Sequence, residues 1–300
     1  MKKKTILILL IISALLSCKK DLFLNKIDYE IPMVPGRLTI SCKLKNGEKP
    51  LALIGTSVHI SSDSTSINDS NFVVKLFEDN LFIENLFPVN GLGYYGGNHT
   101  ITKNHIYQLT VSRNGFNDAT GSTLVPDSVQ FTDYSIQWDS AQEKVHVSFK
   151  IIDPLQTSDY YLIEPYSKDS NDRNRTLQFA TPDPTMEDFS AIDGFLGGIT
   201  PQYSNILHGG VYRDQYFNGQ LKEVQLTLES YFFENNILST VYLRISRISK
   251  GYYEFDKSMN IARSNEILGV IGEPVQIFSN IQGGYGVVAS STAISIELKP

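Results

Sequence analysis

Apolar and polar residues alternate along several short stretches of the chain, and this alternation predicts β-strands. In Leu38–Leu44, the residues Leu38, Ile40 and Cys42 occupy every second position with polar residues between them. In Lys144–Ile152, apolar side chains again fall on every second position. A period of two places these residues on one buried face of a strand. The pattern therefore predicts a protein built mainly of β-sheet.

Residues 36–127 predict an Ig-like or transthyretin-like β-sandwich. Short strand patterns are separated by turn signals such as Asn46-Gly47, and Pro126 ends the last of them. The segment Ser61–Asn71 is rich in Ser and Asp and predicts an exposed loop. Besides the first strand, strands are expected at 51–54, 58–60, 72–77, 81–83, 106–111 and 119–125.

Residues 128–300 predict a second β-rich domain with one short C-terminal helix. The helix is expected from about Lys250 to Arg263, because Tyr252, Phe255 and Met259 lie three and four residues apart and share one face. Prolines, glycines and polar clusters in residues 167–220 predict long loops between short strands. Strands are expected at 128–136, 144–152, 160–163, 225–228 and 241–246.

The N-terminus carries a secretion signal. Three lysines, Lys2 to Lys4, precede an apolar run that ends at Leu16, and this run is shorter than the ~20 residues needed to cross a bilayer. Leu15-Leu16-Ser17-Cys18 has the form of a bacterial lipobox, in which Cys18 receives a diacylglycerol thioether and palmitate-type acylation of its new amino group. An ordinary signal peptide with a chance cysteine is the competing interpretation. We predict a signal peptide at residues 1–17 and a lipidated tether at residues 18–35.

The charge and the cysteine content limit the classes of function that the chain can have. Loss of Lys2–Lys4 with the signal leaves 23 basic against 32 acidic residues, a formal charge of −9. Such a chain is not suited to nucleic acid, whose phosphates are bound by Lys and Arg. With Cys18 lipidated, Cys42 is the remaining cysteine, and its alternating pattern predicts a small strand residue.

Signatures of catalysis or metal binding do not stand out. The five histidines, His59, His99, His105, His146 and His208, do not form a metal-ligand pattern, and no Gly-x-Ser-x-Gly elbow or phosphate-binding loop occurs. Five acids, Asp169, Asp172, Asp183, Asp188 and Asp193, fit solvated loops better than a calcium site. We therefore expect a protein that is not an enzyme and has no metal or cofactor, with a surface hydrolase using two carboxylates as the lesser alternative.

Tyr94 and Tyr95, in a glycine-rich segment, are the best candidate ligand-binding residues. An exposed tyrosine offers a flat apolar ring with a polar end to sugars or partner proteins. The alternative is that one ring enters the core while its neighbour covers an edge.

The chain resembles a family of Bacteroidota outer-membrane lipoproteins of unknown function. The resemblance spans nearly the whole mature chain and rests on motifs in order along it. They are the lipobox with Arg37–Leu44, Ile106–Val111, Asn114–Phe116, Leu124–Pro126, Asp153-Pro154, Asp159–Tyr161, Asp214–Gly219, and Gly272–Val275 followed by Ser279–Gly286.

The resemblance implies a cellular location and a partner protein. Members are often encoded beside TonB-dependent outer-membrane receptors, so we expect a non-catalytic, outer-membrane-anchored partner of such a transporter. A free-standing surface adhesin or glycan-binding module is the alternative. Lys19-Lys20-Asp21 leaves open whether the protein faces the surface or the periplasm. The triplets that begin at Asp63, Asp127 and Asp139 resemble O-glycosylation signals of that phylum.

Overall fold

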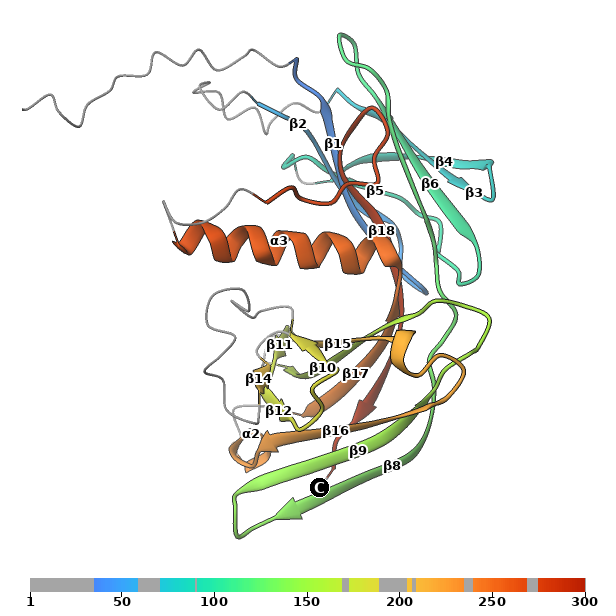
Figure 1. Ribbon diagram of the computed structural model, residues 1–300. Helices are drawn as coiled ribbons and strands as arrows, with labels where there is room; N and C mark the ends of the chain where they lie inside the picture. Colours follow the sequence, from blue (N-terminus) through green and yellow to red (C-terminus); the bar gives the residue numbers. More distant parts are fainter. Residues whose placement is uncertain are drawn as a thin grey trace, which may run out of the picture. The chain divides into compact units, whose positions relative to one another are not determined.

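A computed structural model describes residues 35–58, 71–89, 91–168, 173–188, 204–206, 209–234, 240–268 and 275–299. The chain divides into two units, Met1–Pro35 and Gly36–Pro300. The predicted signal peptide, Cys18 and the tether up to residue 34 lie outside the described residues, as do most of the Ser61–Asn71 loop and the end of the strand predicted at 58–60. The second unit is mainly β, with two sheets and a C-terminal helix, which confirms the predicted fold class (Figure 1).

Strands β1 to β7 form what we call the N-terminal body. Strand β1 illustrates how the sequence specifies it, because Leu38, Ile40, Cys42 and Leu44 are each at most 1% exposed while the residues between them are half-buried or exposed. Burial raises the pKa of the Cys42 thiol to about 12, so Cys42 is the small buried strand residue that its pattern predicts. The strands are β1 Leu38–Lys45, β2 Leu51–Thr56, β3 Val73–Glu78, β4 Leu81–Val89, β5 Tyr94–Gly96, β6 Ile106–Ser112 and β7 Ala119–Leu124.

The later strands, β8 to β17, form the C-terminal body. Strands β14-β12-β16-β9-β8 make one sheet, and β13-β15-β10-β17 belong to the larger sheet that continues into the N-terminal body. Within 167–220, where we predict loops between short strands, the described strands are at most four residues long. The elements are β8 Gln130–Asp139, β9 Lys144–Ile152, β10 Tyr160–Lys168, β11 Asn174–Thr176, β12 Phe179–Thr181, β13 Glu187–Asp188, β14 Ser204–Ile206, β15 Gly210–Arg213, η1 Asp214–Tyr216, β16 Leu221–Glu229, α2 Tyr231–Glu234 and β17 Val241–Ile248.

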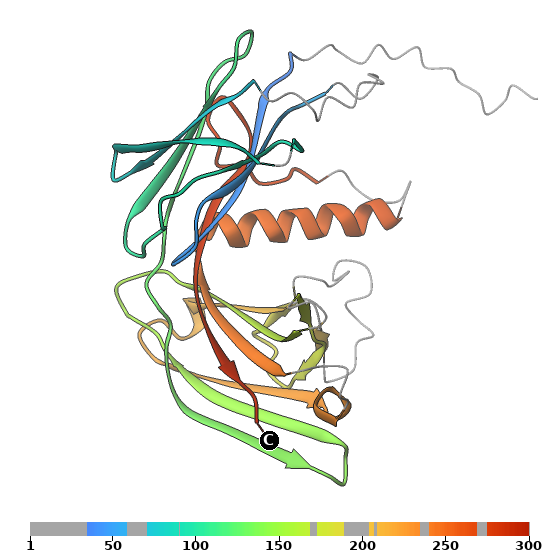
Figure 2. The ribbon, with the colours of Figure 1, turned by 180° about the vertical axis from the view of Figure 1, so that it is seen from behind.

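Strand β18, Gly284–Glu297, joins the two bodies. Its first half pairs in parallel with β1, from Leu38↔Gly284 to Lys45↔Ser291. Its second half pairs antiparallel with β17, from Ile248↔Ser291 to Tyr242↔Glu297. Figures 1 and 2 show this strand passing from one body into the other. The predicted division at residues 127 and 128 lies between β7 and β8, but the N-terminal core also contains Ile281 and Val288 from the far end of the chain.

Helix α3, Lys250–Leu268, begins where predicted and extends a few residues further. The three residues of the predicted apolar face, Tyr252, Phe255 and Met259, are each half-buried, while Tyr253, which the spacing did not single out, is buried at 2% exposed. Tyr253 stacks on Tyr160 of β10 with ring centroids 4.8 Å apart, so the Tyr253 side of the helix lies against the sheet. Among the described residues, no helix combines the length and apolar character needed to span a membrane.

The parallel contact between β1 and β18 depends on glycine. Gly286 has φ +110°, and a Cβ atom there would lie 2.0 Å from the carbonyl oxygen of Ile40. We expect Gly286→Ala to lower the free energy of unfolding by more than ~2 kcal/mol, because positive φ alone costs roughly 1–2 kcal/mol and β1 must also move away. Chemical denaturation followed by circular dichroism measures the loss.

Gly47→Ala is the matched control. Gly47 has φ +82° with nothing within 4 Å of the new Cβ, so this variant carries the backbone cost without the clash. Equal losses in the two variants would show that close packing of β1 on β18 is unimportant.

Candidate functional site

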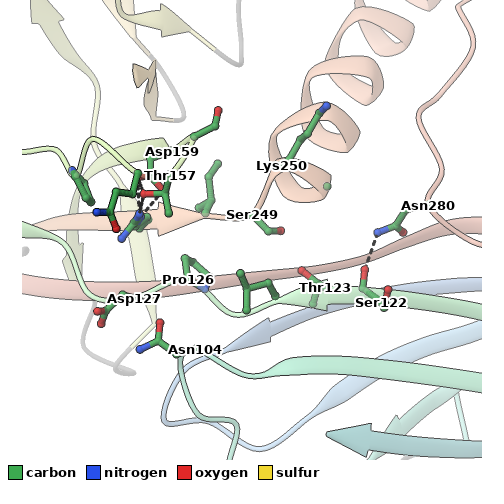
Figure 3. Close-up of a pocket in the computed structure, with 17 residues that line it drawn as sticks. Asn104, Ser122, Thr123, Pro126, Asp127, Thr157, Asp159, Ser249, Lys250 and Asn280 are labelled. Carbon is green, nitrogen blue, oxygen red and sulfur yellow. Dashed lines mark hydrogen bonds and ion pairs between the residues drawn. The ribbon is translucent and has the colours of Figure 1, made fainter. Parts of the chain in front are cut away.

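A cavity of about 640 Å³ lies where the N-terminal and C-terminal bodies meet. Figure 3 shows its walls coming from the end of β7, the loop before β10, and the junction of β17 with α3. A volume of this size is typical of small-molecule sites. The lining residues are Asn104, Ser122, Thr123, Leu124, Pro126, Asp127, Pro154, Gln156, Thr157, Ser158, Asp159, Arg247, Ile248, Ser249, Lys250, Gly251 and Asn280.

One wall is fixed by buried hydroxyl groups in the middle of β18. Ser290, Ser291 and Thr292 are consecutive polar residues in this strand, and they are 0%, 8% and 2% exposed. The Ser290 hydroxyl donates to the carbonyl of Leu124 at 2.7 Å, and the Thr292 hydroxyl donates to that of Pro126 at 2.6 Å. Since buried polar groups need such partners, these two contacts hold the β7 end of the cavity against β18.

A second wall is fixed by Ser249, which precedes α3. Its Oγ accepts hydrogen bonds from the backbone N–H of Tyr252 at 3.3 Å and of Ser290 at 3.0 Å. The first contact caps the N-terminus of the helix, and the second ties the cap to β18. The first turn of α3 is therefore held at the cavity wall.

The third wall contains an ion pair between Arg247 of β17 and Asp159. Their side chains are 9% and 7% exposed. The guanidinium contacts both carboxylate oxygens, through Nε at 2.5 Å and through Nη2, and Nη2 also donates to Thr157 Oγ1 at 2.8 Å. This two-point geometry is the strong form of an arginine–carboxylate contact.

Behind this ion pair lie two more buried acids. Asp153, Asp159 and Asp214 each place a carboxylate oxygen within 4.8 Å of the others. Asp153 accepts hydrogen bonds from the Tyr161 hydroxyl at 2.6 Å and from the Gly219 N–H at 2.8 Å, while Asp214 accepts from the Asp159 N–H at 2.6 Å. Burial, then the negative charges of the other two acids, raises the pKa of Asp214.

Three clustered carboxylates suit a hard cation, but their partners argue for a structural network here. The Arg247 guanidinium lies on Asp159 and supplies the positive charge that a metal ion would bring. Both oxygens of Asp153 accept hydrogen bonds from protein donors. The arrangement fits an ion-paired support for the cavity wall.

The acids considered for calcium from sequence are not brought together in the part that the structure describes. Asp183 pairs with Lys222 at 2.6 Å and accepts from the Tyr212 hydroxyl at 3.0 Å. Asp169, Asp172, Asp193 and the side chain of Asp188 lie outside the described residues.

The two candidate tyrosines occupy different environments. Tyr95 is 1% exposed, packs edge-on against Phe72 with centroids 6.1 Å apart, and accepts the Phe72 N–H at 3.3 Å. Tyr94 is half-buried on the opposite face of β5. Of the pair, only Tyr94 can offer its ring to a partner, and neither residue lines the cavity.

Two histidines converge on Glu78 in a way that the sequence spacing does not reveal. His99 Nε2 lies 3.0 Å from one Glu78 oxygen and His105 Nδ1 lies 3.3 Å from the other, while His105 also contacts Asp79 at 2.6 Å. The hydrogen bond with Asp79 raises the pKa of His105. His146 instead contacts the Thr227 hydroxyl at 3.2 Å, and His59 and His208 lie outside the described residues.

Sequence analysis did not identify Arg247 or the carboxylate cluster as a site. A usable signal was present, however, because several motifs that carry the family resemblance meet at this place. Leu124–Pro126, Asp153-Pro154 and Asp159 contribute to the cavity lining, and Asp214 lies behind it. Asn280, from the Ser279–Gly286 motif, donates to the carbonyl of Ser122 at 3.2 Å.

The ion pair in the third wall yields a stability prediction. We expect Arg247→Met to lower the free energy of unfolding by roughly 3–5 kcal/mol, because it leaves Asp159 buried without its counter-charge. Arg175→Met on the exposed strand β11 is the matched control and should change stability little. Adding Asp159→Asn to Arg247→Met should recover part of the loss in a double-mutant cycle, and independent, additive losses would show that the two charges do not depend on each other.

The histidine cluster yields a pH prediction. We expect the NMR titration midpoint of His105 to lie above its ordinary value of about 6.5 and to fall toward it in Asp79→Asn. A raised pKa in the folded state means that His105 adds stability fully below its unfolded pKa, and that this contribution disappears as the pH rises through the folded pKa. Asp118→Asn, at an exposed loop acid, is the control; an identical His105 midpoint in both variants would remove Asp79 as the cause.

Comparison with known proteins places the chain in a family without assigning it an activity. No curated protein matches it. A family model described as Domain of unknown function (DUF4249) matches residues 25–297, which include every residue that lines the cavity. This confirms the predicted membership of a domain-of-unknown-function family. The chain belongs to the DUF4249 family.

Proposed function

We propose that the protein is an acylated outer-membrane lipoprotein that binds a small ligand in the cavity described above and serves as a non-catalytic partner of a TonB-dependent transporter. The observation that carries the proposal is Leu15-Leu16-Ser17-Cys18 after a basic start and a short apolar run. Multiple acyl chains on Cys18 give stable anchoring, because each buried methylene adds ~0.8 kcal/mol.

The charges in the cavity favour binding over catalysis. Its two acids are both engaged by cations: Asp159 by Arg247, and Asp127 by Lys103 at 2.6 Å. The hydrogen bond from Lys103 holds the pKa of Asp127 below its usual range. A general acid needs a carboxyl group whose pKa is raised toward neutrality, and Asp127 is shifted in the opposite direction. These paired charges support a recognition surface.

The tether fits an anchored protein that works beside a larger membrane partner. Residues 18–35 reach at most ~60 Å when fully extended. That reach keeps the body within a few tens of ångströms of the bilayer. A ligand held in the cavity would then be delivered close to a neighbouring receptor.

The anchor is tested by removing the thiol of Cys18. We expect Cys18→Ser to shift the protein from the membrane fraction to the soluble fraction, with mass spectrometry of the wild-type protein finding an acylated Cys18 at the mature N-terminus. Cys42→Ser, which changes the other of the two cysteines, is the control and should stay with the membrane. A wild-type mature chain that begins elsewhere, or carries a free Cys18 thiol, would overturn the proposal.

The partner is tested in native membranes. Extraction in mild detergent followed by affinity purification should recover a large β-barrel receptor together with the lipoprotein. Recovery of the lipoprotein alone, even after chemical cross-linking, would contradict the transporter partnership. Binding to host polymers without a receptor would favour the adhesin or glycan-binding alternative.

A further inference from the structure

An exposed arginine and an exposed tyrosine lie at the end of the N-terminal body where the tether joins it. The guanidinium carbon of Arg37, one residue after Gly36, lies 5.1 Å from the ring centroid of Tyr285. Arg37 is exposed, and Tyr285 is 43% exposed. Across the described residues, the Arg37 guanidinium has no carboxylate partner, so its charge is open to an anion outside the fold.

A second arginine belongs to the same surface. The guanidinium carbon of Arg113, in the turn between β6 and β7, lies 5.2 Å from the ring centroids of both Phe72 and Phe116. A Cβ atom built on Gly36 would lie 3.3 Å from Cε1 of Phe116, so this turn touches the start of the body. Figures 1 and 2 show the turn and the start of β1 at the same end of the N-terminal body. The residues of what we call the tether-end surface are Arg37, Tyr285, Arg113 and Phe116.

The charge of this end differs from that of the protein as a whole. The start of the body and the β6–β7 turn carry two bases, Arg37 and Arg113, against one acid, Asp118, a formal charge of +1 within a mature chain of −9. The β8–β9 turn, which Figures 1 and 2 show at the opposite end, carries one acid, Glu143, and no base. The end that joins the tether is therefore locally basic in an acidic protein, and it complements an anionic surface.

The chemistry of this surface suits lipid headgroups. A guanidinium group binds phosphate oxygens through two N–H groups at once. A tyrosine offers an apolar ring with a polar end, which fits the boundary between headgroups and acyl chains. Position favours the same partner, because residues 18–35 connect the predicted lipid on Cys18 directly to Gly36. The tether-end surface is thus the part of the folded body that lies nearest to the anchor along the chain.

We infer that the tether-end surface docks on the phosphate headgroups of the membrane that holds the lipid anchor. Arg37 and Arg113 contact lipid phosphates, the ring of Tyr285 lies among the headgroups, and the β8–β9 turn lies far from the bilayer. Each contact is weak, but the tether makes docking an intramolecular step with a high effective concentration, so weak contacts are sufficient. The inference rests on the acyl anchor of the proposed function and adds the orientation in which the anchored body is held.

Fluorescence quenching on the full mature lipoprotein tests this in vesicles of phosphatidylethanolamine and phosphatidylglycerol that contain a headgroup-spin-labelled lipid. A fluorophore attached to Asn114→Cys, in the exposed β6–β7 turn, reports on the tether-end surface, and one attached to Gln142→Cys, in the exposed β8–β9 turn, is the matched control. Cys42 does not take the label, because it is 1% exposed and burial raises the pKa of its thiol to about 12. We expect strong quenching of the first fluorophore and little quenching of the second.

A charge variant and salt identify the contact. Arg37→Gln should lower the docking equilibrium constant about fivefold, because one arginine near an anionic membrane surface contributes ~1 kcal/mol. Arg175→Gln, at an exposed arginine of β11 outside the tether-end surface, should leave the quenching unchanged. Added salt should weaken the quenching at Asn114→Cys without releasing the protein, since screening acts on the phosphate contacts and not on the buried acyl chains. Thermal unfolding of each variant verifies that it is folded.

The other outcomes overturn the inference. Equal quenching of the two fluorophores would show that the body has no fixed orientation, and stronger quenching at Gln142→Cys would place the opposite end at the membrane. Quenching at Asn114→Cys that ignores both Arg37→Gln and salt would reject the phosphate contact. These results are separate from the fate of the proposed function, because failure of the unaltered protein to float with vesicles removes the acyl anchor, whereas flotation with equal quenching removes only the orientation.

Discussion

Strand β18 pairs with β1 along its first half and with β17 along its second, and both bodies depend on these two sets of backbone hydrogen bonds. The parallel pairing brings residues 284–291 beside residues 38–45, so the N-terminal body is complete only when the end of the chain has joined it. Contacts between such distant residues carry a large loop-closure cost before they contribute stability. The pairing is compensated by a buried face in which Val288 lies opposite Cys42 in the shared core.

The change of partner along β18 also explains why a cavity exists at this place. At Ser291 the pairing partner of β18 changes from β1 to β17. The polar side chains next to this point form hydrogen bonds instead of packing in an apolar core. Ser290 bonds to the carbonyl group of the last residue of β7, Leu124, and Thr292 bonds to that of Pro126 just after it. Packing two bodies against one continuous strand leaves space beside the point where the pairing changes, and polar segments from both bodies fill its walls. The same geometry places ligand sites at domain junctions in many proteins.

The alternation of apolar and polar residues was sufficient to predict strands that bury one face and expose the other. Strand β9 matches its predicted bounds because its alternating residues all enter one core. The start of α3 was predictable from its spacing, but the deep burial of Tyr253 was not, since its stacking on Tyr160 is a tertiary contact without a local signal. The pairing of β1 with β18 was likewise beyond the sequence, because an isolated strand does not encode its partner. For the site, the order of the family motifs was visible in the sequence, whereas the Arg247–Asp159 ion pair required the fold to bring β17 beside the loop before β10.

The rigidity of the cavity walls bears on how it can bind a ligand. Ser249 is bonded to both α3 and β18, Arg247 is held by two oxygens of Asp159, and Asn280 bonds to the backbone of both β18 and β7. Walls fixed in this way lose little conformational entropy when a ligand binds. A site of this kind gains affinity through complementarity that exists before a ligand binds.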